Sequence, residues 1–248
     1  MLLIDVGNTN IKSAVWDGGE LIECVSFSTL GPDLENDFES YWLSHASLIS
    51  KVLVSNVATS QVHDRIRRFC KTYFDHEPEF VVSRKVCMGM STRYQRPDTL
   101  GVDRWLASLA AWRMSSGPVC VVDAGTALTV DVVMASGEHV GGLIAPGPDM
   151  LKASLVSGTA GIAIDQFSAV DNFGTNTVEA LSLGCRSAMK GVFSEVQLQL
   201  DKLGISEAAS WYLTGGAADV VEELIPNKCV INPRLVLEGL VALGLNAG

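Results

Sequence analysis

Two stretches of the chain show the same succession of hydrophobic and polar positions. Residues 3–20 read LIDVGNTNIKSAVWDGGE, and residues 121–138 read VVDAGTALTVDVVMASGE. They align without a gap, Asp5 standing against Asp123, an offset of 118 residues. Each copy has an apolar run ending in D-x-G, a polar turn, a second run and a glycine turn. This pattern predicts three successive strands in each copy.

The later parts of the two halves also correspond. Residues 51–58, KVLVSNVA, resemble residues 211–218, WYLTGGAA, and each segment has the pattern of a buried strand followed by small residues. A helical pattern follows each of them, and then a short strand. Each half ends with a proline-led helical pattern, at 96–112 in the first half and at 232–244 in the second. The elements of the two halves therefore follow the same order.

The repeated order predicts the fold class. Three strands, a helix, a strand, a helix, a strand and a helix occur twice, which is typical of two duplicated α/β domains with mixed β-sheets. The sequence SSGP at 115–118 favours a boundary there. We therefore expect domains at 1–115 and 116–248. Chance similarity of two strand-turn-strand units is the alternative, and the matching order of the later elements weighs against it.

Composition and charge narrow the function classes. The 248 residues are 48% hydrophobic and 19% charged, which is typical of a globular protein. A net charge of −10 disfavours broad binding to nucleic acids or anionic membranes. The six cysteines contain no C-x-x-C pair, which disfavours a zinc site or a disulfide framework. The first residues do not resemble a signal peptide, and no apolar run approaches membrane-spanning length, so we expect a cytoplasmic protein.

The two D-x-G turns carry candidate chemistry. Gly7 and Gly125 permit close backbone approach to a ligand, and successive N–H groups in such turns bind anions. Lys12 follows the first turn and can meet phosphate oxygens, while Asp5 and Asp123 are oxygen ligands suited to Mg²⁺ or another hard cation. Two such turns facing across a cleft would suit phosphoryl transfer. The alternative is that both are ordinary hairpin turns.

The segment 94–104, YQRPDTLGVDR, opens the last predicted helix of the first half. Pro97 disfavours helical geometry at Arg96, so Asp103 falls near the helix N-terminus. The helix dipole there favours an ionised carboxylate that can accept a proton, and Arg104 can bind an anion bidentately. The alternative is that Asp103 only complements the dipole and that Arg104 is a solvated neighbour.

These motifs together closely resemble type III pantothenate kinase. D-x-G-N-T-x-x-K begins at Asp5, Y-x-x-P at Tyr94, G-x-D-R at Gly101 and D-x-G-T-A at Asp123. The resemblance runs over essentially the whole chain, although the family most often has Ala where Val102 stands. Because that family belongs to the acetate kinase, sugar kinase, Hsp70 and actin superfamily, the resemblance implies two ribonuclease-H-like domains with an ATP cleft between them.

The resemblance also implies the reaction and its residues. The reaction would be the ATP-dependent phosphorylation of pantothenate to 4′-phosphopantothenate, the first step of coenzyme A biosynthesis, with Asp103 as the general base. The implied ATP-binding residues are Asp5, Val6, Gly7, Asn8, Thr9, Asn10, Ile11, Lys12, Thr126, Gly215 and Gly216. The implied pantothenate-binding residues are Tyr94, Gly101, Val102, Asp103, Arg104 and Thr177. Asp5 would bind Mg²⁺, and Asp123 would bind a monovalent cation, K⁺ or NH₄⁺.

The implied assembly is a homodimer. A long helix is expected over about 177–200, with a stripe of small residues made by Ala180, Gly184, Ala188 and Gly191. Such a stripe allows another helix to approach closely, either within the chain or from a second copy.

Two other functions stay open from the sequence. One is a nucleotide-binding regulatory protein on the same fold, and the other is a different small-molecule kinase of the superfamily. The presence of Asp5, Lys12, Asp103, Arg104 and Asp123 favours catalysis over regulation. The Y-x-x-P and G-x-D-R segment favours pantothenate over other small molecules.

Overall fold

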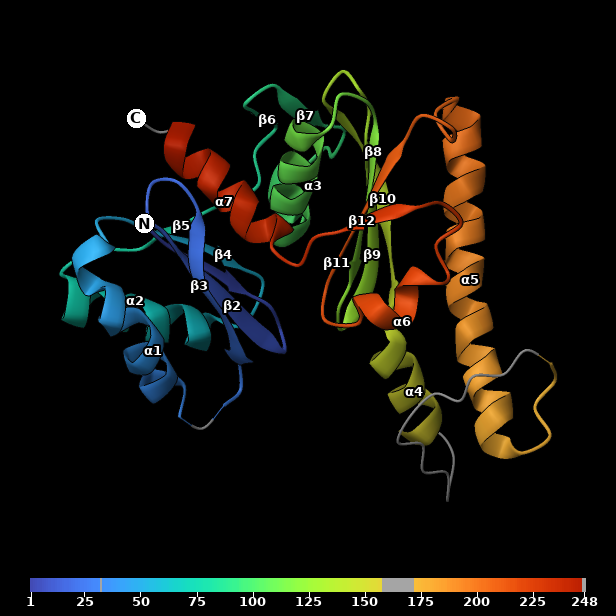
Figure 1. Ribbon diagram of the computed structural model, residues 1–248, viewed down its shortest axis with the longest axis horizontal. Helices are drawn as coiled ribbons and strands as arrows, with labels where there is room; N and C mark the ends of the chain where they lie inside the picture. The colour runs from blue at the N-terminus through green and yellow to red at the C-terminus, as the bar shows by residue number, and fades with distance from the viewer. Residues whose placement is uncertain (32, 158–171, 247–248) are drawn as a thin grey trace. The chain divides into compact units, whose positions relative to one another are not determined.

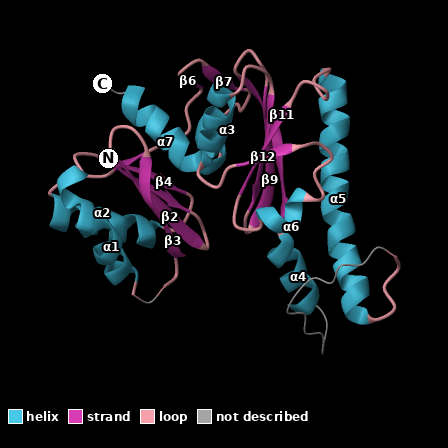
Figure 2. Cartoon of the chain, in the orientation of Figure 1, coloured by secondary structure: helices cyan, strands magenta, loops and turns pink. Residues whose placement is uncertain are grey.

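The computed structural model describes residues 1–31, 33–157 and 172–246 (Figure 1). The chain divides into two compact units. Unit 1 consists of Met1–Met114, Gly137–His139 and Arg234–Gly248, and unit 2 consists of Ser115–Ser136 and Val140–Pro233. Each unit is a mixed sheet with helices packed against it (Figure 2).

Unit 1 contains a five-stranded sheet in the order β3-β2-β1-β4-β5. Its strands are β1 (Leu2–Val6), β2 (Asn10–Trp16), β3 (Leu21–Ser28), β4 (Val52–Asn56) and β5 (Glu79–Phe80). Strand β1 lies at the centre of the sheet. Its residues Leu2, Leu3, Ile4 and Val6 are fully buried, since apolar side chains on both faces of a strand require elements packed on both sides. It pairs antiparallel with β2 and parallel with β4.

Four helices pack against this sheet, namely α1 (Leu34–Trp42), α2 (Ser60–Phe74), α3 (Val102–Met114) and α7 (Leu235–Asn246). One core cluster joins the sheet to the apolar faces of α1 and α2, with Phe38, Trp42 and Phe69 at its centre. Helices α3 and α7 pack against each other, and both contact β4. Short 3₁₀ helices occur at Leu43–Leu48 and Pro97–Thr99.

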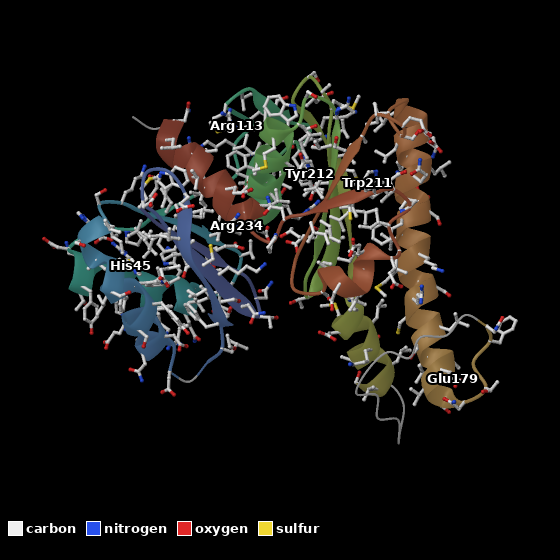
Figure 3. The ribbon with its side chains drawn as sticks, viewed as in Figure 1. His45, Arg113, Glu179, Trp211, Tyr212 and Arg234 are labelled. Atoms are coloured by element: carbon white, nitrogen blue, oxygen red, sulfur yellow. The ribbon has the colours of Figure 1, made fainter. Side chains whose placement is uncertain are left out.

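Unit 2 contains strands in the order β12-β11-β8-β9-β10. These are β8 (Val119–Ala124), β9 (Ala127–Val133), β10 (Glu138–Pro146), β11 (Ser210–Thr214) and β12 (Cys229–Ile231). The helices are α4 (Pro148–Ser157), α5 (Thr177–Leu203) and α6 (Ala218–Glu222). Trp211 on β11 points toward α5, where it packs near Phe193 (Figure 3). The apolar face of α5 thereby covers one side of the sheet.

The strand orders confirm the predicted mixed α/β fold. In chain order, β1 to β5 of unit 1 correspond to β8, β9, β10, β11 and β12 of unit 2, and both sheets have the order 3-2-1-4-5 in these terms. Unit 1 also holds two short strands that the repeat did not predict, β6 (Val86–Cys87) and β7 (Met90–Thr92). Strand β7 pairs with the first residues of β10, Glu138 and His139, which belong to unit 1.

The compact units do not follow the predicted boundary throughout. The chain passes from unit 1 to unit 2 between Met114 and Ser115. Helix α7, near the end of the chain, belongs to unit 1 rather than to unit 2. Gly239 explains this packing, because a Cβ there would lie 2.5 Å from the Leu106 carbonyl oxygen on α3. The glycine therefore permits a helix contact that no larger residue allows.

The gapless alignment of the two D-x-G turns is wrong by one residue beyond the turn. In the strand register of unit 1, Asp5 on β1 stands opposite Lys12 on β2. In unit 2, Asp123 on β8 stands opposite Thr129 on β9. The alignment placed Val130 opposite Lys12. The second turn is one residue shorter, so the position that shares a face with the aspartate is occupied by Thr129.

Helix α5 begins at the predicted residue and ends slightly later than predicted, at Leu203. Asn176 caps its N-terminus by accepting a hydrogen bond from Glu179 N at 3.0 Å, and Gly204 follows its C-terminus with φ +70. Across the three described ranges, no helix has the length and apolar character needed to span a membrane.

Candidate functional site

The first D-x-G turn joins β1 to β2 and carries Asp5 at the end of the central strand. Asp5 lies directly opposite Lys12 in the antiparallel pair and beside Ser55 in the parallel pair with β4. The Ser55 hydroxyl donates to Asp5 Oδ1 at 3.0 Å. Asp5 is thereby hydrogen-bonded to Ser55 of β4, and Lys12 of β2 stands at the strand position opposite it.

The backbone of this turn is tied to the chain that follows β3. Gly7 N donates to the Asn10 carbonyl at 2.9 Å, which closes the turn. The Thr29 hydroxyl donates to the Gly7 carbonyl at 2.9 Å, and Thr29 N donates to the Thr9 carbonyl at 2.9 Å. Asn8 and Thr9 are exposed at the tip. The turn therefore has a braced backbone and polar side chains that face solvent.

The second D-x-G turn is enclosed by two glycine turns of unit 2. Gly215 has φ +100, and a Cβ there would lie 2.3 Å from the Ala124 carbonyl oxygen and 2.5 Å from Asp123 Oδ1. A Cβ on Gly147 would lie 2.3 Å from the Gly125 carbonyl oxygen. Neither position can take a side chain without displacing the turn. Thr126 is exposed at its tip.

The G-x-D-R segment begins helix α3 of unit 1. Asp103 lies in the first turn of the helix, and its Oδ1 accepts a hydrogen bond from Arg104 N at 2.7 Å. A Cβ on Gly101 would lie 2.6 Å from the same oxygen, so glycine leaves room for the carboxylate. Arg104 is buried, with 8% of its surface exposed, and its Nη1 donates to the Tyr94 hydroxyl at 3.4 Å. Tyr94 and Arg104 are therefore in contact.

Thr177 is the first residue of α5 and is exposed. Thr175 N and the Thr175 hydroxyl both donate to Glu179 Oε2, at 2.8 and 2.9 Å, and these bonds lower the pKa of the Glu179 carboxyl. Figure 3 shows Glu179 at that end of the helix. A cavity of about 590 Å³ opens beside Thr177, lined by Leu155, Gly174, Thr175, Asn176, Thr177, Ala180, Leu181 and Gly184.

The predicted site residues therefore form three local groups, with Thr177 as one further position. Asp5 to Lys12 make one group and Tyr94 with Gly101 to Arg104 make another, both in unit 1. In unit 2, Asp123 lies against Gly215, with Gly216 next in the same turn, and Thr126 lies against Gly147. Thr177 belongs to unit 2 and lies beside the cavity at the start of α5.

Known proteins resemble this chain over most of its length. The family model for type III pantothenate kinase matches residues 1–198. The chain belongs to the type III pantothenate kinase family. It is 32% identical over 247 residues to the type III pantothenate kinase of Nitrosomonas eutropha. That alignment covers 98% of this chain and 93% of the relative.

Solved structures share the fold of this type III pantothenate kinase family member. A Baf family transcriptional activator from Campylobacter jejuni matches with TM-score 0.61 and 23% identity, covering 100% of this chain and 98% of that one. The activator of 2-hydroxyisocaproyl-CoA dehydratase from Clostridium difficile, solved with ADPNP, matches with TM-score 0.55 and 11% identity, covering 100% and 93%. These matches show a shared fold, and membership of the type III pantothenate kinase family makes the chain a kinase.

Reasoning from sequence missed three residues that shape the turns of this kinase. Ser55 was part of a recognised strand, but its place beside Asp5 depends on parallel pairing across 50 positions. Thr29 carried no motif, although it braces the first turn. Gly147 stood in the GGLIAPG segment, and its glycine was the available signal that a backbone passes close to it.

The buried thiols of the chain take no part in this site. Burial raises the pKa of Cys70 to about 12 and that of Cys120 well above its ordinary value. Both thiols therefore stay protonated at neutral pH and are poor nucleophiles. Among the described residues, no three or more His, Cys, Asp and Glu side chains are grouped so that they could hold a metal ion.

Proposed function

We propose that this chain transfers the γ-phosphoryl group of ATP to pantothenate, giving 4′-phosphopantothenate at the first step of coenzyme A biosynthesis. The observation that carries this proposal is the G-x-D-R geometry, in which Asp103 opens helix α3 beside Arg104 and Arg104 reaches the Tyr94 hydroxyl. Relatives that align over nearly the full chain carry the name type III pantothenate kinase, which supports the same substrate.

On the pantothenate side, Asp103 acts as the general base for the primary hydroxyl of the substrate. The N-terminus of α3 favours its ionised form, and the Arg104 N–H bond orients one of its oxygens. The guanidinium of Arg104 supplies charge for the anionic substrate, and Tyr94 lies against it. Gly101 and Val102 precede Asp103 in the same segment and complete this set of pantothenate-binding residues, and the family resemblance adds Thr177 at the start of α5.

On the ATP side, the first turn binds phosphate oxygens through its backbone and through Lys12. The residues involved are Asp5, Val6, Gly7, Asn8, Thr9, Asn10, Ile11 and Lys12. The donor set around Asp5 fits Mg²⁺, which is typically held by one or two carboxylates together with substrate phosphates. When bound with ATP, Mg²⁺ would neutralise charge on the phosphates. Asp5 would hold it, and Lys12 would offset charge on the transferring group.

The second turn binds ATP through Thr126, Gly215 and Gly216, and Asp123 holds a monovalent cation, K⁺ or NH₄⁺. Two oxygen atoms near Gly215 support the cation assignment. Asp123 Oδ1 and the Ala124 carbonyl oxygen both lie close to the position that a Cβ on Gly215 would take. The turn has Thr129 where unit 1 has Lys12. A bound cation would supply the charge that lysine supplies in unit 1.

The proposed assembly is a cytoplasmic homodimer. Ala180, Gly184, Ala188 and Gly191 are all exposed on α5, and a Cβ on either glycine would meet no atom within 4 Å. This stripe permits close approach of a helix from a second copy. Sedimentation or light scattering on the purified chain tests the state, and Gly184→Leu should weaken a dimer formed through this face.

The reaction is tested by coupled ADP release. The purified chain should release ADP with ATP, Mg²⁺ and pantothenate, and release with glucose or acetate in place of pantothenate should stay at the blank rate. Mass spectrometry of the product should show a phosphate ester of pantothenate. ADP release that ignores pantothenate would overturn the proposal and favour a different kinase or a regulatory role.

A further inference from the structure

The segment that carries Tyr94 is supported by two buried polar side chains. Thr92, at the end of β7, is 2% exposed, and His139, at the start of β10, is 0% exposed. Thr92 Oγ1 and His139 Nδ1 are 2.9 Å apart, and Tyr94 N donates to Thr92 Oγ1 at 3.2 Å. The Thr92 hydroxyl therefore connects the imidazole to the backbone of Tyr94.

Other contacts hold the same segment. Arg93 N donates to the His139 carbonyl at 2.9 Å. Lys85 Nζ donates to the Thr92 carbonyl at 2.6 Å and to the Tyr94 carbonyl at 3.3 Å. The rings of Tyr94 and His139 have centroids 5.9 Å apart. Tyr94 is thus constrained at its N–H and its carbonyl, and its ring borders the imidazole.

The Tyr94 hydroxyl links this support to the residues proposed to bind pantothenate, because Arg104 Nη1 donates to it at 3.4 Å. We infer that His139 and Thr92 are positioning residues for pantothenate, which orient Tyr94 and, through its hydroxyl, the Arg104 guanidinium. This inference rests on the proposed function, since it requires Tyr94 and Arg104 to bind the substrate. Burial strengthens this positioning, because a buried hydroxyl that loses its hydrogen-bond partners destabilises its surroundings.

Isosteric and conservative variants test the inference. Thr92→Val removes the hydroxyl at nearly constant volume, while Thr92→Ser keeps it. Thr92→Val should raise the KM for pantothenate about three- to tenfold, the range expected for one lost hydrogen bond, and should leave the KM for ATP unchanged. Thr92→Ser should stay close to wild type. His139→Leu should act like Thr92→Val, and His139→Asn should recover part of the loss, since asparagine can place a donor or an acceptor at the δ position.

A double-mutant cycle separates positioning from general destabilisation. Tyr94→Phe already removes the hydroxyl that contacts Arg104, so Thr92→Val should add less than about twofold to the KM for pantothenate in that background. Additive effects would overturn the inference. So would a Thr92→Val variant with a lower unfolding midpoint and an unchanged KM for pantothenate. If His139→Leu does not fold, the Thr92 pair and the cycle with Tyr94→Phe still decide.

The failure of the inference can be told from the failure of the proposed function. A wild-type chain that releases no ADP with pantothenate overturns the proposed function and the inference with it. A wild-type chain that turns over pantothenate, with additive effects in the cycle, overturns the inference alone.

Discussion

The D-x-G turn of unit 1 and the D-x-G turn of unit 2 follow equivalent central strands, but different groups surround their carboxylates. Asp5 lies opposite Lys12 and accepts a hydrogen bond from Ser55. Asp123 lies opposite Thr129, and the turn at Gly215 passes so close that no side chain fits there. The position opposite the aspartate is a lysine in unit 1 and a threonine in unit 2, while the position beside it carries a hydroxyl in both units, on Ser55 and on Thr214.

One repeated framework therefore holds two D-x-G turns with different neighbours. The pairing of the central strands was retained in both units, because it depends on buried apolar residues. The residues around the turns are not constrained by the core and can differ. In the proposed reaction, unit 1 supplies a fixed cation and the base, and unit 2 supplies backbone groups and one carboxylate for a bound cation.

The largest expected effect concerns the base in unit 1. Asp103→Asn should lower kcat by roughly 10²–10⁴-fold, the usual contribution of a positioned proton acceptor, with the fold intact by circular dichroism. Asp98→Asn is the matched control, since Asp98 is exposed and pairs with Arg96 outside the proposed site. A near-normal kcat for Asp103→Asn would contradict the assignment of Asp103 in unit 1 as the general base.

The lysine of the first turn should have the next largest effect. Lys12→Ala should lower kcat by about 10²–10³-fold, as expected when one preorganised charge on the transition state is lost. Thr129→Ala, at the corresponding place in unit 2, should change kcat by less than about twofold, because a neutral hydroxyl contributes little to phosphate charge. Steady-state kinetics of the two variants measures the contrast. Equal losses would mean that the turns do not differ in charge supply.

The carboxylate of the second turn should make activity depend on a monovalent cation. Wild-type activity should rise about tenfold or more when K⁺ or NH₄⁺ replaces Na⁺, in keeping with a charge-assisted contact. Asp123→Ala should lower activity and abolish this response together. Full wild-type activity with Na⁺ or a bulky organic cation alone would remove the cation from the second turn and contradict the comparison.

The smallest expected effect concerns the backbone of the second turn. Gly215→Ala should lower the free energy of unfolding by about 1–3 kcal/mol, because φ is +100 and a Cβ would meet the Ala124 carbonyl at 2.3 Å. Gly216→Ala is the control, since a Cβ there meets nothing within 4 Å. Urea unfolding monitors both. If the two alanine variants are equally stable, the second turn is not closed by Gly215.

The sequence by itself determined the local elements and their order. The apolar runs before each D-x-G marked the central strands, the repeat of the later elements indicated the duplicated fold, and the pattern over 177–200 marked the long helix that begins at Thr177. Pro97 and the residues after it placed Asp103 at a helix N-terminus. Such features depend on periodicity and on residues a few positions apart, and these are readable along the chain.

Only the tertiary structure decided which residues meet around the turns. Alignment of 51–58 with 211–218 set Ser55 against Gly215, but pairing with β1 and β8 makes Thr214 the counterpart of Ser55. Strand register depends on turn length and on which face is buried, so a shift of one residue is invisible to an alignment of apolar positions. The contact between Thr92 and His139, which supports Tyr94, likewise joins two strand residues 47 positions apart. Contacts of this kind arise from the packing of the whole unit rather than from any local pattern.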